Sequence, residues 1–151
     1  MKALFTNKWL WIPLATWFLV QLFKLIVEIF SAKGRKINFK RVLGSGGMPS
    51  SHTACVVSLA TSIGMTEGIG FGSPYFALAA VFCFIVMYDA AGVRRAAGKQ
   101  AAILNKIIEN DGSLNVQEKL GELIGHTPLQ VVVGMIVGVI FGIVFSLIWD
   151  L

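Results

Sequence analysis

The sequence has few charged residues and few cysteines. Only 14% of its 151 residues are charged, whereas 56% are hydrophobic. This balance excludes an ordinary water-soluble domain, in which about a quarter of the residues are charged and about half are apolar. The two cysteines, Cys55 and Cys83, lie in apolar runs without the spacing of a metal site or a disulfide framework. We therefore expect an integral membrane protein that uses no metal or other cofactor.

Long hydrophobic runs are abundant and set the expected architecture. The chain length allows about four spans of roughly 20 residues with short connections, and no separate soluble domain. The runs place these spans at residues 9–30, 49–65, 74–90 and 127–149. The first run is long and has no clean small-residue cleavage site, so we expect it to be retained. The expected fold class is all-α, a polytopic membrane helical bundle covering residues 1–151 as one domain.

Residues 94–124, between the third and fourth runs, predict one or two short interfacial helices. Leu104 and Ile108 recur near one helix face, and Arg95 and Lys99 fall on another. A basic face opposite an apolar face is typical of a helix that lies in the membrane surface.

The basic residues are concentrated in two segments, which predicts the orientation of the chain. The net charge is +5, and residues 31–41 and 91–126 carry five basic residues each. Loops rich in Lys and Arg stay in the cytoplasm. We therefore expect both segments inside and both chain ends outside, with a membrane partner and no nucleic-acid partner.

A glycine-rich turn at residues 44–54, Gly-Ser-Gly-Gly-Met-Pro-Ser-Ser-His-Thr-Ala, is expected to open the second span. Pro49 suits a first helical position, and the free N–H groups of a first helical turn form an anion site. His52 would then lie where a phosphate binds. The alternative is a flexible loop that Ser50 merely caps.

A similar turn, Gly125-His126-Thr127-Pro128, precedes the last span. With Thr127 as N-cap and Pro128 as first helical residue, His126 would lie just before a second helix N-terminus. The expected topology brings both histidines and the pair Arg94 and Arg95 to the cytoplasmic face. Phosphoryl transfer needs such a set, because one histidine attacks phosphorus, the other protonates the leaving oxygen, and cations hold the charge. Positive-inside bias alone explains the arginines, but it does not explain the two histidines.

Three blocks in this order, GGMPSSH, YDAAGVRRAAGKQA and GHTPLQVVVG, resemble the divergent branch of the phosphatidic acid phosphatase and vanadium haloperoxidase superfamily. The resemblance covers nearly the whole chain. It implies a metal-independent phosphatase in which His52 is the acid and His126 is the nucleophile. It also implies a location in a bacterial plasma membrane.

The chain departs from the pattern of that superfamily at several positions. Gln130 stands where a carboxylate would orient the nucleophilic imidazole, and Leu120 stands where an arginine belongs. Gln130 can still accept an imidazole N–H through its amide oxygen. We expect phosphate binding by residues from the matching blocks, with looser candidates for the incomplete first motif, and a supporting role for Asp89. The phosphate-binding set is Ser50, Ser51, Arg94, Arg95, Lys99, Lys24 and Arg41.

The sequence thus predicts a membrane lipid-phosphate phosphatase that acts on a phosphomonoester of the phosphatidylglycerophosphate or phosphatidic acid type. One alternative is a non-enzymatic lipid-phosphate binder or transporter, of polyprenyl phosphate type, that keeps the anion site. Another is a structural membrane partner. Gly134, Gly138 and Gly142 line one helix face, which favours close packing against another span or a homo-oligomer.

Overall fold

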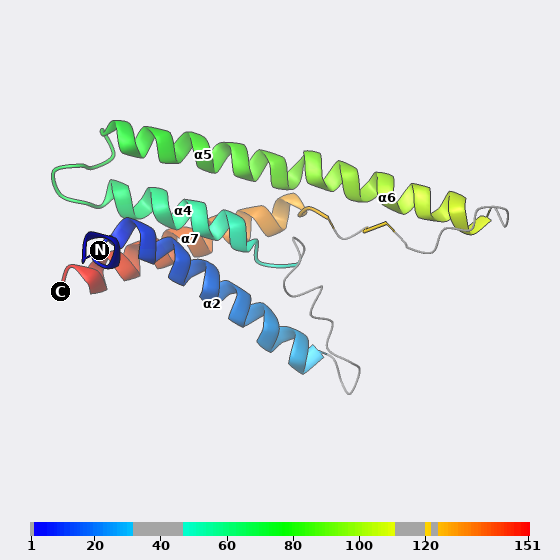
Figure 1. Ribbon diagram of the computed structural model, residues 1–151, viewed down its shortest axis with the longest axis horizontal. Coiled ribbons are helices and arrows are strands. Elements are labelled where there is room, and N and C mark those ends of the chain that lie inside the picture. Colours follow the sequence, from blue (N-terminus) through cyan, green and yellow to red (C-terminus); the bar gives the residue numbers. More distant parts are fainter. Residues whose placement is uncertain (1, 32–46, 111–119, 122–123) are drawn as a thin grey trace.

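The computed structural model describes residues 2–31, 47–110, 120–121 and 124–151 (Figure 1). The described residues form helices and no strand, which confirms the all-helical fold class. The helices are α1 (Lys2–Phe5), α2 (Lys8–Ser31), α4 (Ser51–Gly64), α5 (Pro74–Ala91), α6 (Val93–Asn110) and α7 (Pro128–Trp149).

Helix α4 is the centre of the bundle and contacts α2, α5 and α7 (Figure 1). Its side chains are small, so the neighbouring helices can approach closely. Its hydroxyls are satisfied inside the helix, since Ser58 donates to the Cys55 carbonyl and Ser62 to the Leu59 carbonyl, both at 2.8 Å. A polar helix can therefore lie in the middle of an apolar bundle without unpaired hydroxyls at these two positions.

The glycine face of α7 packs against α4 of the same chain. A Cβ on Gly138 would lie 2.7 Å from the Ala54 carbonyl oxygen, and one on Gly134 would lie 2.7 Å from that of Ser50. The predicted close packing against another span is therefore present. Within one chain α4 occupies this face, and the predicted homo-oligomer stays a prediction.

The four-span prediction is not confirmed by helix length. Among the described residues, three helical segments are long and apolar enough to cross a membrane: Lys8–Phe30, Pro74–Asn110 and Pro128–Trp149. Helix α4 has only 14 residues. At 1.5 Å per residue it is about 21 Å long, shorter than a hydrocarbon core of about 30 Å. The number of spans stays a prediction.

Helix α6 continues the line of α5, and the two form one long rod (Figure 1). The structure therefore confirms a helix in the first part of residues 94–124, but as an extension of the third span. Its buried residues are Gly98, Ala101 and Asn105. The second short helix predicted there falls mostly outside the described residues, and Leu120 and Gly121 are not helical. Whether α6 lies in the membrane surface stays a prediction.

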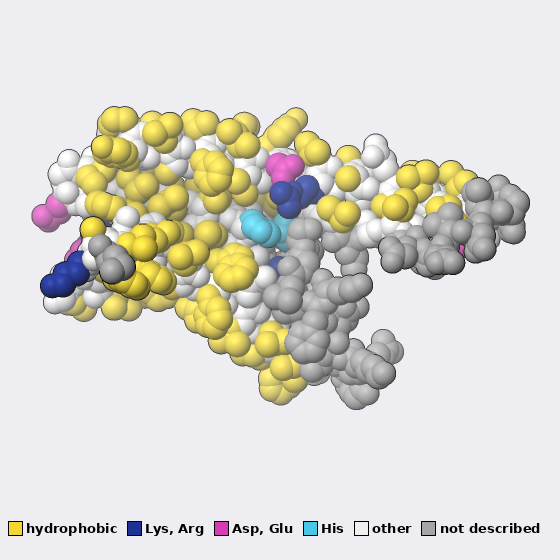
Figure 2. All heavy atoms as spheres, in the orientation of Figure 1, with side chains coloured by type: hydrophobic (Ala, Val, Ile, Leu, Met, Phe, Trp, Pro, Cys, Tyr) yellow, Lys and Arg dark blue, Asp and Glu magenta, His cyan; other side chains and the backbone are white. Residues whose placement is uncertain are grey.

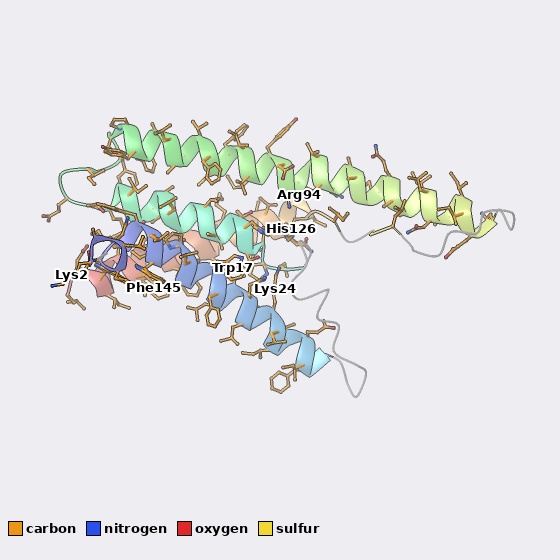
Figure 3. The ribbon with its side chains drawn as sticks, viewed as in Figure 1. Lys2, Trp17, Lys24, Arg94, His126 and Phe145 are labelled. Atoms are coloured by element: carbon orange, nitrogen blue, oxygen red, sulfur yellow. The ribbon has the colours of Figure 1, made fainter. Side chains whose placement is uncertain are left out.

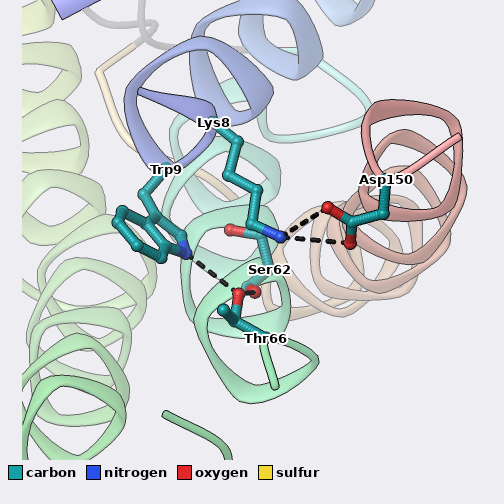
Figure 4. A network of polar contacts seen from close by, with 5 residues as sticks. All are labelled: Lys8, Trp9, Ser62, Thr66 and Asp150. Atoms are coloured by element: carbon teal, nitrogen blue, oxygen red, sulfur yellow. Dashed lines mark hydrogen bonds and ion pairs between the residues drawn. The ribbon is translucent and has the colours of Figure 1, made fainter. Parts of the chain in front are cut away.

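The two chain ends lie together at one end of the bundle, which polar contacts close (Figures 1 and 4). Lys8 Nζ contacts the two carboxylate oxygens of Asp150 at 2.8 and 3.1 Å, which joins α2 to the end of α7. Trp9 Nε1 donates to Thr66 Oγ1 at 3.1 Å, and Thr66 Oγ1 donates to the Ser62 carbonyl at 2.8 Å. We call this the terminal end.

Candidate active site

The two histidine turns meet at the opposite end of the bundle, as the sequence predicts. The glycine-rich turn opens a helix, but α4 begins at Ser51 and its N-cap is Ser50, whose side chain accepts from the Thr53 N–H. Pro49 therefore precedes the cap and is not the first helical residue, since the Ser50 hydroxyl provides the capping acceptor. The second turn is as predicted, with Thr127 as the N-cap of α7 and Pro128 in its first turn.

Backbone hydrogen bonds tie the two turns to each other and to the rod. The Ser50 N–H donates to the Gln130 carbonyl at 3.2 Å, which joins the start of α4 to the start of α7. The His126 N–H donates to the Ala90 carbonyl at 2.9 Å, which joins the same turn to the end of α5. Main-chain contacts therefore fix the position of His126 against two other helices.

Gly125 allows the His126 turn to approach the rod closely. Its φ is +92°, and a Cβ at this position would clash with the Arg95 backbone nitrogen. Both the backbone conformation and the contact therefore require glycine. The sequence reasoning missed this role, although a glycine directly before a capped histidine was the available signal.

Asn105 holds the segment that leads into this turn. Its Nδ2 donates to the Leu120 carbonyl at 2.9 Å, and the Leu120 N–H donates to its Oδ1 at 2.9 Å. The Asn105 side chain is buried, whereas that of Leu120 is 45% exposed. Asn105 thus holds Leu120 by its backbone. The Leu120 side chain takes no part in these hydrogen bonds, so Leu120 corresponds to the superfamily's arginine by sequence position alone. The role of Asn105 was also missed, and its only signal was an amide within an amphipathic helix.

The position of the proton on His126 follows from its contacts with α7. His126 Nδ1 lies 3.3 Å from Gln130 Oε1, which also accepts the Thr127 N–H at 3.0 Å. Because an amide oxygen only accepts, Nδ1 carries the proton and Nε2 carries the lone pair. The Nε2 atom is buried and has no hydrogen-bond partner among the described residues. The imidazole is therefore held in the tautomer that a nucleophile at Nε2 needs.

A cavity of about 350 Å³ adjoins this imidazole. Arg95 and Lys99, four residues apart on α6, line it together with His126 and Gln130. The other described lining residues are Gly47, Gly98, Ala102, Ile124, Gly125 and Thr127. Two cations and no acidic side chain among the described lining residues make this cavity suitable for an anion such as a phosphate.

The environment of His126 favours its neutral form. Burial is the main reason why its pKa lies below the ordinary value of 6.5, and the interactions with the Gln130 side chain and with the Gly47 backbone oppose this shift. The positive charges of Lys24 and His52 lower the pKa further. His126 is therefore neutral at pH 7, as nucleophilic attack requires.

Lys24 and Arg94 lie near His126 without lining the cavity (Figure 3), and basic and acidic side chains adjoin the histidines at the surface (Figure 2). Lys24 is 7% exposed, and its Cε lies 3.8 Å from where a Cβ on Gly47 would be. Arg94 forms an ion pair with Asp89 at the surface. The arginine pair is thus divided, because Arg95 lines the cavity while Arg94 is held by Asp89. Asp89 therefore supports Arg94.

The remaining predicted residues have different positions. His52 is exposed and does not line the cavity. Ser50 and Ser51 are buried and do not line it either, and the Ser50 hydroxyl accepts hydrogen bonds from the Thr53 N–H and hydroxyl. Arg41 lies outside the described residues. No group of three His, Cys, Asp or Glu side chains in the described part of the chain could hold a metal ion.

Comparisons with known proteins agree with this picture. The fold defines an all-helical membrane protein with a cationic cavity at a buried histidine. The chain belongs to the Divergent PAP2 family, whose model matches residues 5–141. It is also similar to the Uncharacterized membrane protein YuiD of Bacillus subtilis (strain 168), with 36% identity over 144 residues that cover 87% of this chain and 89% of the relative. No solved structure matches.

Proposed function

We propose that the protein is a lipid-phosphate phosphatase that hydrolyses a phosphomonoester, of the phosphatidylglycerophosphate or phosphatidic acid type, through a phosphohistidine on His126. The observation that carries this proposal is the buried, unpartnered Nε2 atom of His126 at a cavity that Arg95 and Lys99 line. Membership of the Divergent PAP2 family supports the phosphatase class.

In the first step, the lone pair of His126 Nε2 forms a bond to phosphorus while the bond from phosphorus to the lipid oxygen breaks. Protonated His52 gives its proton to the departing alkoxide. The positive charge that develops on the His126 ring is stabilised by the Gln130 amide oxygen at Nδ1.

In the second step, water attacks the phosphoimidazole and gives a proton to His52, which releases phosphate and restores neutral His126. Arg95 and Lys99 hold the nonbridging oxygens in both steps, since negative charge is spread over them in the transition state. The positive charge of Lys24 near the cavity also attracts the anion, whereas that of Arg94 is offset by Asp89.

A second candidate function is a lipid-phosphate binder or transporter that keeps the anion site without chemistry. Gln130 favours this candidate, because a neutral amide stabilises an imidazolium less than a carboxylate does. The two functions differ in a single observable, the release of inorganic phosphate.

The decisive experiment measures inorganic phosphate released from a panel of lipid phosphates by the purified protein. Release that vanadate blocks and a chelator does not block supports the phosphatase, with His126→Asn as the inactive control. Tight binding of the same lipids without release by the wild type would contradict it and favour the binder.

We also propose that the active face is cytoplasmic, in a bacterial plasma membrane, because the sequence between α2 and α4 and that between α5 and α7 carry ten of the thirteen basic residues. A cysteine at exposed Asn110, in a protein that lacks Cys55 and Cys83, tests this. It should resist a membrane-impermeant thiol reagent in intact cells and react after lysis. Labelling in intact cells would contradict the cytoplasmic face and direct the search to polyprenyl pyrophosphates.

A further inference from the structure

A second cavity, of about 440 Å³, lies between α5 and α7 with α4 as its floor. The space exists because small side chains, Ala60 and Thr61 on α4 and Ala80 on α5, face it. The Thr61 hydroxyl donates to the Val57 carbonyl of its own helix at 2.8 Å, so this hydroxyl already has a partner. The α7 wall consists of Met135, Val139 and Ile143. We call this cavity the chain groove.

The chain groove and the His126 cavity share helix α7, and their other walls belong to α5 and α6, the two parts of the rod. Gln130 lines the His126 cavity and Met135 lines the groove. These two residues are about 7.5 Å apart along the axis of α7, at 1.5 Å per residue. Both walls belong to helices that are long and apolar enough to cross a membrane. Phe71 and Phe76, whose rings meet edge to face at a centroid distance of 5.0 Å, line the groove where α5 begins, far from His126.

We infer that the chain groove binds one hydrocarbon chain of the lipid phosphate whose headgroup enters the His126 cavity. This inference rests on the proposed function. A cationic cavity followed along one helix by an apolar groove matches an amphiphile, because the phosphate meets charge while the chain stays among apolar side chains. Met65 and Met135 in the wall are unbranched and adapt to an irregular, flexible chain.

The test fills the groove. Ala80→Phe places a large ring in it, and Ala77→Phe, at an exposed position of the same helix, is the matched control. For a long-chain phosphatidic acid, Ala80→Phe should lower kcat/KM about tenfold, mainly through KM, which corresponds to the lost burial of roughly two methylene groups. Hydrolysis of glycerol 3-phosphate, which has the same phosphate ester without chains, should not change.

Equal losses for both substrates, or no loss, would overturn the inference. Equal effects of Ala77→Phe and Ala80→Phe would overturn it as well. If Ala80→Phe does not fold, as judged by circular dichroism and gel filtration, Ala80→Leu takes its place with Ala77→Leu as its control.

A binding measurement separates this inference from the proposed function. A phosphatidic acid with a photoreactive diazirine near the end of one chain should label peptides that contain Cys83 and Val139, and Ala80→Phe but not Ala77→Phe should reduce the labelling. This result without any phosphate release would retain the groove and reject the phosphatase. Labelling that Ala80→Phe leaves unchanged would reject the groove. A change in oligomer mass with unchanged labelling would show a contact between copies instead.

Discussion

The two ends of the bundle use polar groups in opposite ways. At the terminal end, Lys8 pairs with Asp150, and Trp9 and Thr66 form a chain of hydrogen bonds that ends on the Ser62 carbonyl (Figure 4). The opposite end contains the two histidine turns, and we call it the histidine end. There, His126 Nε2 is buried without a partner among the described residues, and two cations line the adjoining cavity.

The difference between the ends separates stability from chemistry. A surface ion pair contributes about 0–1 kcal/mol, whereas a buried polar atom left without a partner costs about 1–3 kcal/mol. Ser146 Oγ, one turn before Asp150, is also buried without a partner among the described residues, but only at the histidine end does such an atom adjoin a cavity that cations line. Substitutions at the histidine end should accordingly change phosphate release, whereas those at the terminal end should change only the unfolding free energy.

The largest effect is expected at the histidines themselves. His126→Ala should abolish turnover of every substrate, because it removes the nucleophile. His52→Ala should lower turnover of lipid phosphates about 10²- to 10⁴-fold and be partly rescued by a phosphate ester with a good leaving group, which needs no proton. Steady-state kinetics on the two substrate types measure this. Equal losses by His52→Ala on both types would contradict its role as the acid.

The next effect is expected at Gly125, which supports the histidine end without taking part in chemistry. Gly125→Ala should cost about 1–3 kcal/mol in unfolding free energy for its positive φ. It should also lower activity by up to about 10²-fold, because the Arg95 backbone would push the histidine turn away. Thermal unfolding in detergent and phosphate release measure the two effects.

Gly121→Ala is the matched control for this substitution, since its Cβ would meet only the Ile124 side chain, at 3.6 Å. It should be nearly neutral. Two alanine variants with the same activity would show that the close approach at Gly125 does not matter for the site.

A smaller and pH-dependent effect is expected at Gln130. Activity requires neutral Nε2, so it is lost as the pH falls through the pKa of His126, which lies below 6.5. A carboxylate in Gln130→Glu favours the imidazolium, raises this pKa and moves the acid limb of kcat/KM to higher pH. At a pH where His126 is neutral and His52 is still protonated, activity of this variant should be retained or raised, because the mechanism needs both forms.

Gln130→Leu removes the acceptor at Nδ1 and should lower activity roughly tenfold at every pH. The pH profile of kcat/KM for both variants measures these changes. Full activity of Gln130→Leu would show that this residue only packs.

The smallest effect is expected at the terminal end. Asp150→Asn should change the unfolding free energy by at most about 1 kcal/mol and leave phosphate release unchanged, because the Asp150 side chain is 54% exposed. Chemical unfolding in detergent measures the first quantity. A clear loss of phosphate release would show that the two ends are coupled.

Local patterns in the sequence predicted much of this molecule. Hydrophobic runs located the long helices, and the Thr-Pro pair before α7 predicted both its N-cap and its first residue. These features depend on neighbouring residues only, so a single sequence contains them. The meeting of His52 and His126 at one end followed from alternation of the helices across the bundle.

Features that depend on close contacts between distant segments could not be predicted. The role of Gly125 depends on the Arg95 backbone, and that of Asn105 depends on Leu120. Whether Arg94 or Arg95 faces the cavity depends on the angle at which α6 passes the His126 turn. The glycine face of α7 was predicted to pack closely, but the sequence did not say that α4 covers it.

The length of the rod of α5 and α6 also indicates how deep in a membrane the site would lie. Pro74–Ala90 contains 17 residues, about 25 Å at 1.5 Å per residue, and the His126 backbone is bonded to Ala90. A hydrocarbon core of about 30 Å that begins near Pro74 would therefore end close to His126. The reactive nitrogen would then lie near the boundary between the hydrocarbon core and the headgroups, so a lipid phosphate could reach it without leaving its leaflet.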